Sequence, residues 1–291
     1  MIYSNILKTK LDNCDICPRN CFCNRNAGDI GYCGMGNRLV IASFGEHFGE
    51  EPEIVGNYAS GTIFFSGCNL LCNFCQNFDI SHFKFGKISS ITELSNIMLD
   101  LQQRNCENIN LVTPTHFSPL ILEAIILAKD QGLDIPIVYN SSAYEKVETL
   151  KAFEGLIDIY MPDLKFIDPK KSALYCKAND YFQFAIEAIS EMHRQVGDLI
   201  INNGVAKKGL LIRHLVFPNN QSDTNEIINV VANKFGTNTY LNLMDQYHPC
   251  YKANKFDMIN RNLYQQEFLN YVKYAKSKGF YRPNYLYDNL K

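Results

Sequence analysis

The chain has 291 residues, of which 46% are hydrophobic and 20% charged, enough apolar side chains to bury a sizeable core. Its formal net charge of −2 gives no reason to expect nucleic acid or an anionic membrane as a partner. We find no stretch apolar enough for a signal peptide or a membrane span, and therefore expect a cytoplasmic protein. In that compartment the 11 cysteines favour metal binding over disulfides.

The first 34 residues contain five cysteines in a segment too short and too polar to build its own core. Cys14, Cys17, Cys21 and Cys33 form the favoured ligand set, with Cys23 as a spare or a substitute. Zinc and a second iron–sulfur cluster both accept four thiolates, so the spacing does not choose between them. The alternative is a group of reduced thiols that only pack against the rest of the protein.

We divide the chain into a cysteine-rich metal-binding segment, residues 1–50, and a main domain, residues 51–291. In the main domain, apolar strands alternate with amphipathic helices. The predicted strands are 62–65, 110–112, 135–139, 156–160, 209–217 and 239–243, and the predicted helices are 91–104, 120–129, 145–153, 185–196, 224–234 and 265–276. Six such units are too few for a complete eightfold barrel. We therefore expect an α/β fold, an incomplete (β/α)6 TIM-like barrel with a C-terminal helix and tail.

Three cysteines follow the first predicted strand with the spacing Cys-x3-Cys-x2-Cys: Cys68, Cys72 and Cys75. Three thiolates can hold three irons of a cubane [4Fe–4S] cluster and leave the fourth iron open for chemistry. Gly67 allows the chain to turn from the strand into the loop. The alternatives are three buried free cysteines or a zinc loop that borrows a distant ligand.

Hydroxyl and amide side chains follow the next two strands, whose ends should meet at the mouth of a barrel. Thr113 and Thr115 follow the second strand, and Asn140 and Ser142 follow the third. These groups suit a ribose or an amine; the alternative for Ser142 is a cap at the start of the next helix. His116, in the same turn as the threonines, is more often a packed or solvated residue than a chemical group.

Charged side chains are associated with the fourth and fifth predicted strands. Asp163 and Lys165 alternate along extended chain, so both should point into the mouth, unless they form a solvated surface pair. Arg213 lies inside the apolar fifth strand, where an unpaired charge is costly. We expect it to meet either a cofactor carboxylate or Asp163.

The Cys-x3-Cys-x2-Cys pattern, with Phe74 before its last cysteine, resembles the radical S-adenosylmethionine (SAM) superfamily. Over nearly the whole chain the sequence is similar to the pyruvate formate-lyase activating enzyme-like subgroup, which is related to activases of glycyl radical enzymes. The motifs are Cys-Pro-Arg-x-Cys near Cys17, Glu50-Glu-Pro52, Gly61-Thr-Ile-Phe-Phe-Ser-Gly-Cys68, Cys75-Gln-Asn77, Thr113-Pro-Thr-His116, Pro162-Asp-Leu-Lys165 and Asn242-Leu-Met-Asp-Gln-Tyr-His-Pro249.

That resemblance implies that Cys68, Cys72 and Cys75 bind a [4Fe–4S] cluster, and that Asp163, Lys165 and Arg213 contact SAM. It further implies an electron donor such as flavodoxin or ferredoxin, and reductive cleavage of SAM to a 5′-deoxyadenosyl radical that abstracts hydrogen. A glycyl radical enzyme is the protein substrate that the subgroup suggests. The turn after the second strand lacks the family's Gly-Gly-Glu, and the cysteine module precedes the radical motif instead of following it.

Two other functions stay open from the sequence. One is a non-catalytic iron–sulfur or zinc scaffold protein that uses both cysteine groups structurally. The other is a radical SAM enzyme that modifies RNA or another substrate, against which the balanced charge argues.

Overall fold

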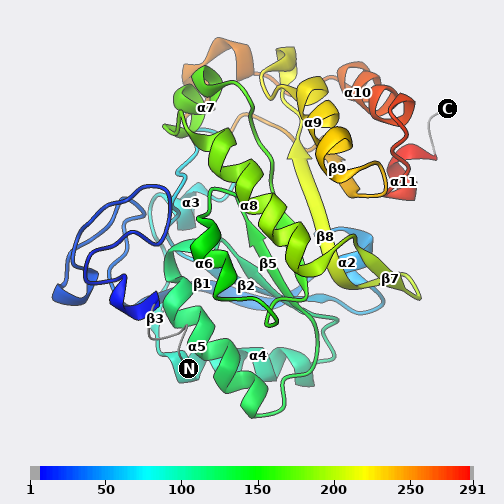
Figure 1. The fold of residues 1–291 in the computed structure, drawn as a ribbon. Coiled ribbons are helices and arrows are strands. Elements are labelled where there is room, and N and C mark those ends of the chain that lie inside the picture. Colours follow the sequence, from blue (N-terminus) through cyan, green and yellow to red (C-terminus); the bar gives the residue numbers. More distant parts are fainter. Residues whose placement is uncertain (1–6, 289–291) are drawn as a thin grey trace.

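A computed structural model describes residues 7–288, and its centre is a nine-stranded, mostly parallel sheet (Figure 1). Six strands run parallel in the order β2, β4, β5, β6, β8 and β9. Their bounds are Ser60–Phe65, Ile109–Val112, Ile137–Ser141, Ile159–Pro162, Val205–Leu215 and Tyr240–Met244. Each overlaps one predicted strand, and the predicted α/β fold with a mostly parallel sheet is confirmed.

Three antiparallel strands were not predicted. β1 (Leu39–His47) pairs with β2 and with β3 (Lys87–Ser89), so the sheet already begins inside the segment that we assigned to the cysteine-rich module. β7 (Ile200–Asn202) forms a hairpin with β8. Its turn contains Asn203 and Gly204 with φ of 52° and 81°. Asn-Gly is a strong hairpin signal because both positions favour positive φ.

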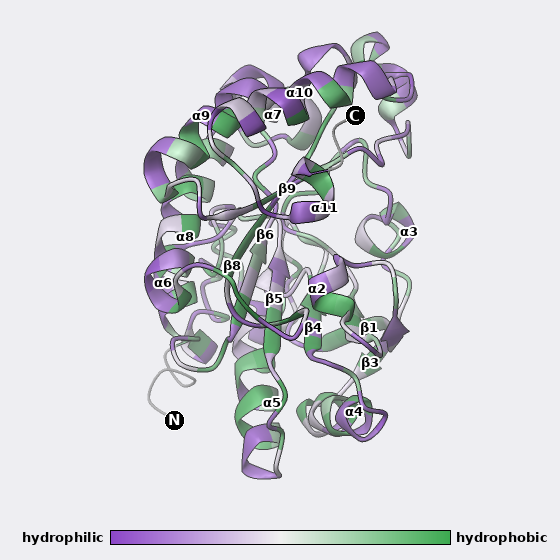
Figure 2. Cartoon of the chain, turned by 90° about the vertical axis from the view of Figure 1, so that its right-hand side faces the viewer, coloured by the Kyte–Doolittle hydropathy of each residue, from purple (hydrophilic) through white to green (hydrophobic). Residues whose placement is uncertain are grey.

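The helices lie outside the strands, with hydrophobic residues concentrated on the sheet and on the helix faces toward it (Figure 2). Their bounds are α2 Pro52–Val55, α3 Phe78–Ser81, α4 Ile91–Gln103, α5 Ser118–Asp130, α6 Val147–Lys151, α7 Pro169–Cys176, α8 Tyr181–Val196, α9 Thr224–Phe235, α10 Gln265–Ser277 and α11 Asn284–Tyr287. Within residues 7–288 no helix combines the length and hydropathy needed to cross a membrane.

α4 shows how local sequence sets these elements. Ser90 and Glu93 form a capping box: the Ser90 hydroxyl accepts from the Glu93 N–H at 3.1 Å, and the Glu93 carboxylate accepts from the Ser90 N–H. Leu94, Met98 and Leu101 follow at helical spacing and are buried. The unpredicted α7 is also capped, because the Asp168 side chain accepts from the Lys170 N–H at 2.7 Å.

Candidate functional site

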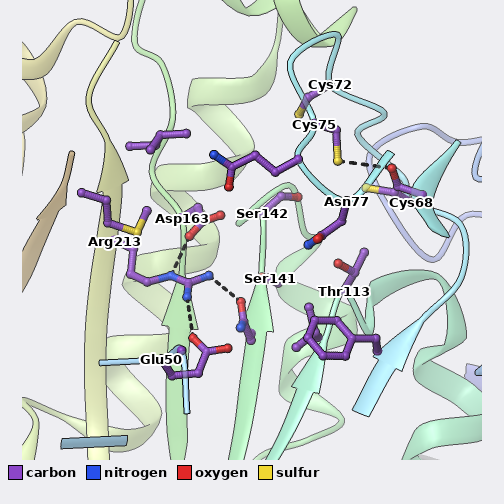
Figure 3. Close-up of a pocket in the computed structure, with 18 of the residues that line it drawn as sticks. Glu50, Cys68, Cys72, Cys75, Asn77, Thr113, Ser141, Ser142, Asp163 and Arg213 are labelled. Atoms are coloured by element: carbon purple, nitrogen blue, oxygen red, sulfur yellow. Dashed lines mark hydrogen bonds and ion pairs between the residues drawn. The ribbon is translucent and has the colours of Figure 1, made fainter. Parts of the chain in front are cut away.

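A cavity of about 510 Å³ lies at the carboxyl ends of the parallel strands (Figure 3). Loops after parallel strands converge there, and small-molecule sites have comparable volumes. Cys68, Cys72 and Cys75 line it on one side, across from Asp163 and Arg213. The other predicted site residues that line it are Thr113, Asn140, Ser142 and Lys165.

The cysteine loop begins at a glycine that no other residue could replace without movement. Gly67 has φ of +79°, and a Cβ there would lie 2.7 Å from the carbonyl oxygen of Cys33. Further along the loop, the Leu70 N–H donates to Cys68 Sγ at 3.3 Å, and Cys75 Sγ lies 3.2 Å from Ser81 Oγ. A glycine turn and hydrogen bonds to two of its sulfurs therefore shape the loop and orient these thiols.

A fourth thiol, Cys176 at the end of α7, lies against this loop. Its buried Sγ donates to Cys72 Sγ at 3.3 Å. This hydrogen bond, with burial, raises the pKa of Cys72 well above its usual value. Burial also raises the pKa of Cys75 to about 12, so metal binding here must displace protons. No local pattern pointed to Cys176, because the contact joins positions 104 residues apart.

Arg213 is the centre of an ionic network on the opposite wall of the cavity (Figure 3). Its Nε donates to Asp163 Oδ1 at 2.8 Å, Nη1 to Glu50 Oε2 at 3.0 Å and Nη2 to Asn140 Oδ1 at 2.8 Å. Lys165 Nζ donates to the other Asp163 oxygen at 2.7 Å. We expected Arg213 to meet either a cofactor carboxylate or Asp163. The structure shows the contact with Asp163, a carboxylate that also accepts from Lys165.

The network holds its charges over a wide pH range. Burial opposes ionisation of Asp163, but Arg213 and Lys165 outweigh it and lower the pKa of this carboxyl. Burial lowers the pKa of Lys165, but the attraction of Asp163 and Cys72, together with the hydrogen bond to Asp163, outweighs burial and raises this pKa. Glu50 differs, since burial raises its pKa despite the nearby Arg213. The cavity wall thus presents fixed positive and negative groups to a ligand.

Two neighbouring acidic residues that line the cavity, Glu50 and Glu51, were not predicted as site residues. Asn242 Nδ2 donates to Glu51 Oε1 at 2.8 Å, whereas the buried Glu51 Oε2 has no hydrogen-bond partner among the residues described. The contact of Glu50 with Arg213 spans 163 positions, which no local pattern reveals. The signal available in the sequence was an arginine inside an apolar strand, where a charge needs a counter-charge.

Thr115 was expected to bind the cofactor, but it does not line the cavity. It begins a 3-10 turn (Thr115–Phe117), and its hydroxyl donates to the buried Glu145. His116 is also buried, with Nε2 2.7 Å from the Ser66 carbonyl, and burial lowers its pKa to about 3. By contrast Ser142 lines the cavity, and its buried Oγ has no hydrogen-bond partner in the described chain.

The N-terminal cysteines lie apart from the cavity wall. Cys14, Cys17 and Cys33 are buried, whereas Cys21 and Cys23 are partly exposed, and all five are free thiols. Across residues 7–288 no three His, Cys, Asp or Glu side chains converge closely enough to hold a metal ion. Neither Cys68, Cys72 and Cys75 nor the described N-terminal cysteines converge in this way.

Comparison with known proteins identifies relatives along most of the chain. Residues 62–220 match the family model of the radical SAM superfamily. Two uncharacterized proteins of Methanocaldococcus jannaschii are similar: one is 31% identical over 97% of this chain and 79% of its own length, and the other 24% identical over 96% and 85%.

Two solved structures share the fold at low sequence identity. Methylornithine synthase has a TM-score of 0.52 at 14% identity, over 79% of this chain and 68% of that chain. The FeFe-hydrogenase maturase HydG from Carboxydothermus hydrogenoformans has a TM-score of 0.50 at 13% identity, over 77% and 53%. This chain therefore spans about half of the maturase.

Proposed function

Because this chain belongs to the radical SAM superfamily, we propose that it cleaves SAM reductively at a [4Fe–4S] cluster bound by Cys68, Cys72 and Cys75. The family implies both the cluster and SAM. The observation that carries the assignment to these residues is that the three cysteines line one cavity together with the charged network of Asp163 and Arg213. When bound, the cluster supplies an open iron for SAM and the electron that breaks its sulfonium bond.

The residues present fit such a cofactor. Three thiols on one loop match a cluster that keeps one iron open, and the neighbouring Cys176 belongs to α7 and not to this loop. The Leu70 N–H directed at Cys68 Sγ is the kind of hydrogen bond that tunes cluster potential. Phe74, buried between Phe217 and Phe166 with ring centroids at 4.6 and 6.0 Å, restricts water beside the loop.

The opposite wall supplies the groups that hold SAM. Lys165 carries donors beyond the one it gives to Asp163, and we assign it to the methionine carboxylate. Asp163 orients Lys165 and Arg213. The unpartnered Ser142 Oγ, with Thr113 and Asn140 beside it, is assigned to the ribose and the methionine amine.

For the hydrogen donor we propose a polypeptide, a glycyl radical enzyme, as the motif resemblance suggests. An exposed aromatic surface next to the cysteine loop supports a protein partner: Phe83 and Phe85 are 54% and 63% exposed. Phe78 of α3 stacks on Tyr251 beside them, with ring centroids 5.5 Å apart. The same surface suits an electron donor such as flavodoxin or ferredoxin, and the thiol chemistry favours the cytoplasm.

Oxygen-free reconstitution tests this function. Protein loaded with iron and sulfide, then reduced with dithionite, should convert SAM into methionine and 5′-deoxyadenosine. A non-catalytic scaffold would bind iron and form neither product. Addition of a glycyl radical enzyme should give a glycyl radical signal by electron paramagnetic resonance. Cleavage of SAM without that signal would leave the superfamily chemistry in place and reject this substrate.

A further inference from the structure

Five cysteines gather in the N-terminal loops, outside the cavity already described. The sulfurs of Cys21, Cys33 and Cys23 surround Gly31, at 3.5, 3.6 and 3.9 Å from the position that a Cβ there would occupy. Cys14 is held beside Cys23 by its N–H, which donates to the Cys23 carbonyl at 2.9 Å. Residues up to 19 positions apart in sequence thus bring their thiols into one small region.

A buried cation next to these thiols has no carboxylate partner. Arg25 is 1% exposed, and within residues 7–288 no Asp or Glu forms an ion pair with it. Its guanidinium donates to the carbonyls of Gly36 and His116 and, at 3.8 Å, to Cys14 Sγ. Burying a charge without a counter-charge is costly. Thiolates bound to a metal centre would supply the missing negative charge.

A second contact has the form expected at a metal thiolate. The Tyr32 N–H donates to Cys21 Sγ at 3.2 Å. The Leu70 N–H makes the same type of bond to Cys68 Sγ at 3.3 Å, in the loop assigned to the radical SAM cluster. Hydrogen bonds from backbone N–H groups to ligand sulfurs are typical of iron–sulfur sites.

The spacing of the thiols favours a cluster over a single ion. Zinc needs four sulfurs at about 2.3 Å from one point, and the described side chains do not converge to that degree. In an iron–sulfur cluster each thiolate binds a different iron, so the sulfurs stand further apart. Cys68, Cys72 and Cys75, the assigned ligands of a cluster, likewise do not converge on a single metal-ion position among the residues described.

We infer that the N-terminal loops bind a second iron–sulfur cluster through Cys14, Cys21, Cys33 and a fourth thiolate from Cys17 or Cys23. This site is separate from the SAM-cleaving centre. The loops also contact that centre directly: Arg19 donates to the carbonyls of Asn69 at 2.8 Å and Leu70 at 3.2 Å. The second cluster therefore orders a segment that supports the cysteine loop of the first.

The test separates the two centres in the full-length protein. A variant with Cys68, Cys72, Cys75 and Cys176 all replaced by alanine cannot form the first cluster. After anaerobic reconstitution it should retain iron and sulfide in a ratio of about one, with visible absorption that dithionite bleaches. Further replacement of Cys21 and Cys33 by serine should remove both, whereas Cys106→Ser, at a buried thiol outside both groups, should not.

Circular dichroism on each variant reports whether it folds. If the variant that also lacks Cys21 and Cys33 does not fold, the amounts of iron and sulfide retained by the four-alanine variant decide whether a second cluster is bound. Zinc in place of iron, or no metal in a folded four-alanine variant, would overturn the second cluster. Either result would leave cleavage of SAM by the unaltered protein untouched.

Discussion

Replacement of Asp163 by asparagine tests how the charged wall of the cavity holds SAM. Asp163 accepts from Lys165 at 2.7 Å and from Arg213 at 2.8 Å. In the variant Arg213 keeps Glu50 and Asn140, but the Lys165 side chain keeps no other hydrogen-bond partner within the described chain. Loss of one charge-assisted hydrogen bond costs about 1.5–3 kcal/mol. At about 1.4 kcal/mol per factor of ten, SAM affinity should fall roughly tenfold to hundredfold.

The assay is calorimetric titration of SAM into reconstituted protein, with iron counted on the same sample. Asp163→Asn should keep its iron, because the cysteine loop follows a different strand from Asp163. Lys165→Met should lower the affinity for SAM by a similar factor. If Asp163 acts by orienting Lys165, the double variant should bind no worse than either single one. Glu191→Gln is the matched control: its carboxylate is 7% exposed and accepts from Arg194 at 2.8 Å, away from the cavity. Wild-type affinity in both site variants would refute the reasoning.

Two further predictions concern stability. Burial raises the pKa of Glu145 from 4.5 to about 8. Ionising this carboxyl therefore destabilises the folded state, an effect that is absent below about pH 4.5 and grows as the pH rises to 8. Glu145→Gln should therefore gain stability over the wild type between pH 4.5 and pH 8, by up to about 4 kcal/mol in chemical unfolding; an equal difference at both pH values would contradict this. Ser90→Ala removes the capping box of α4 and should lower the free energy of unfolding by about 1 kcal/mol. Ser89→Ala, one residue earlier, should change the midpoint of chemical unfolding little.

The sequence predicted the elements that depend on local pattern. Six parallel strands and the cysteine loop follow from apolar runs, spacing and one glycine. The β7–β8 hairpin was missed although Asn203-Gly204 signals it locally. We expected Thr115 in the mouth of the barrel because it follows Thr113 by two residues. That expectation failed because Thr113 has φ of 60° and the chain then enters a 3-10 turn toward Glu145.

The contacts that complete the site could not be predicted, because they depend on tertiary packing. Glu50 reaches Arg213 across 163 positions, and Cys176 reaches Cys72 across 104. Neither pair has a spacing that distinguishes it from other acidic or thiol residues. The position of Arg213 inside an apolar strand showed only that it needed a partner. Asp163 could be proposed as that partner because it follows the preceding predicted strand.

Formation of 5′-deoxyadenosine by cysteine variants tests the central claim most directly. Cys68→Ala and Cys75→Ala are made singly, and Cys72→Ala is combined with Cys176→Ala, because the neighbouring Cys176 thiol could replace Cys72. Cys106→Ala is the control, since this buried thiol does not line the cavity. After anaerobic reconstitution and reduction, we expect the control to form 5′-deoxyadenosine at the wild-type rate and the other three to form none. Wild-type product formation by any of those three would contradict the assignment of the cluster to Cys68, Cys72 and Cys75.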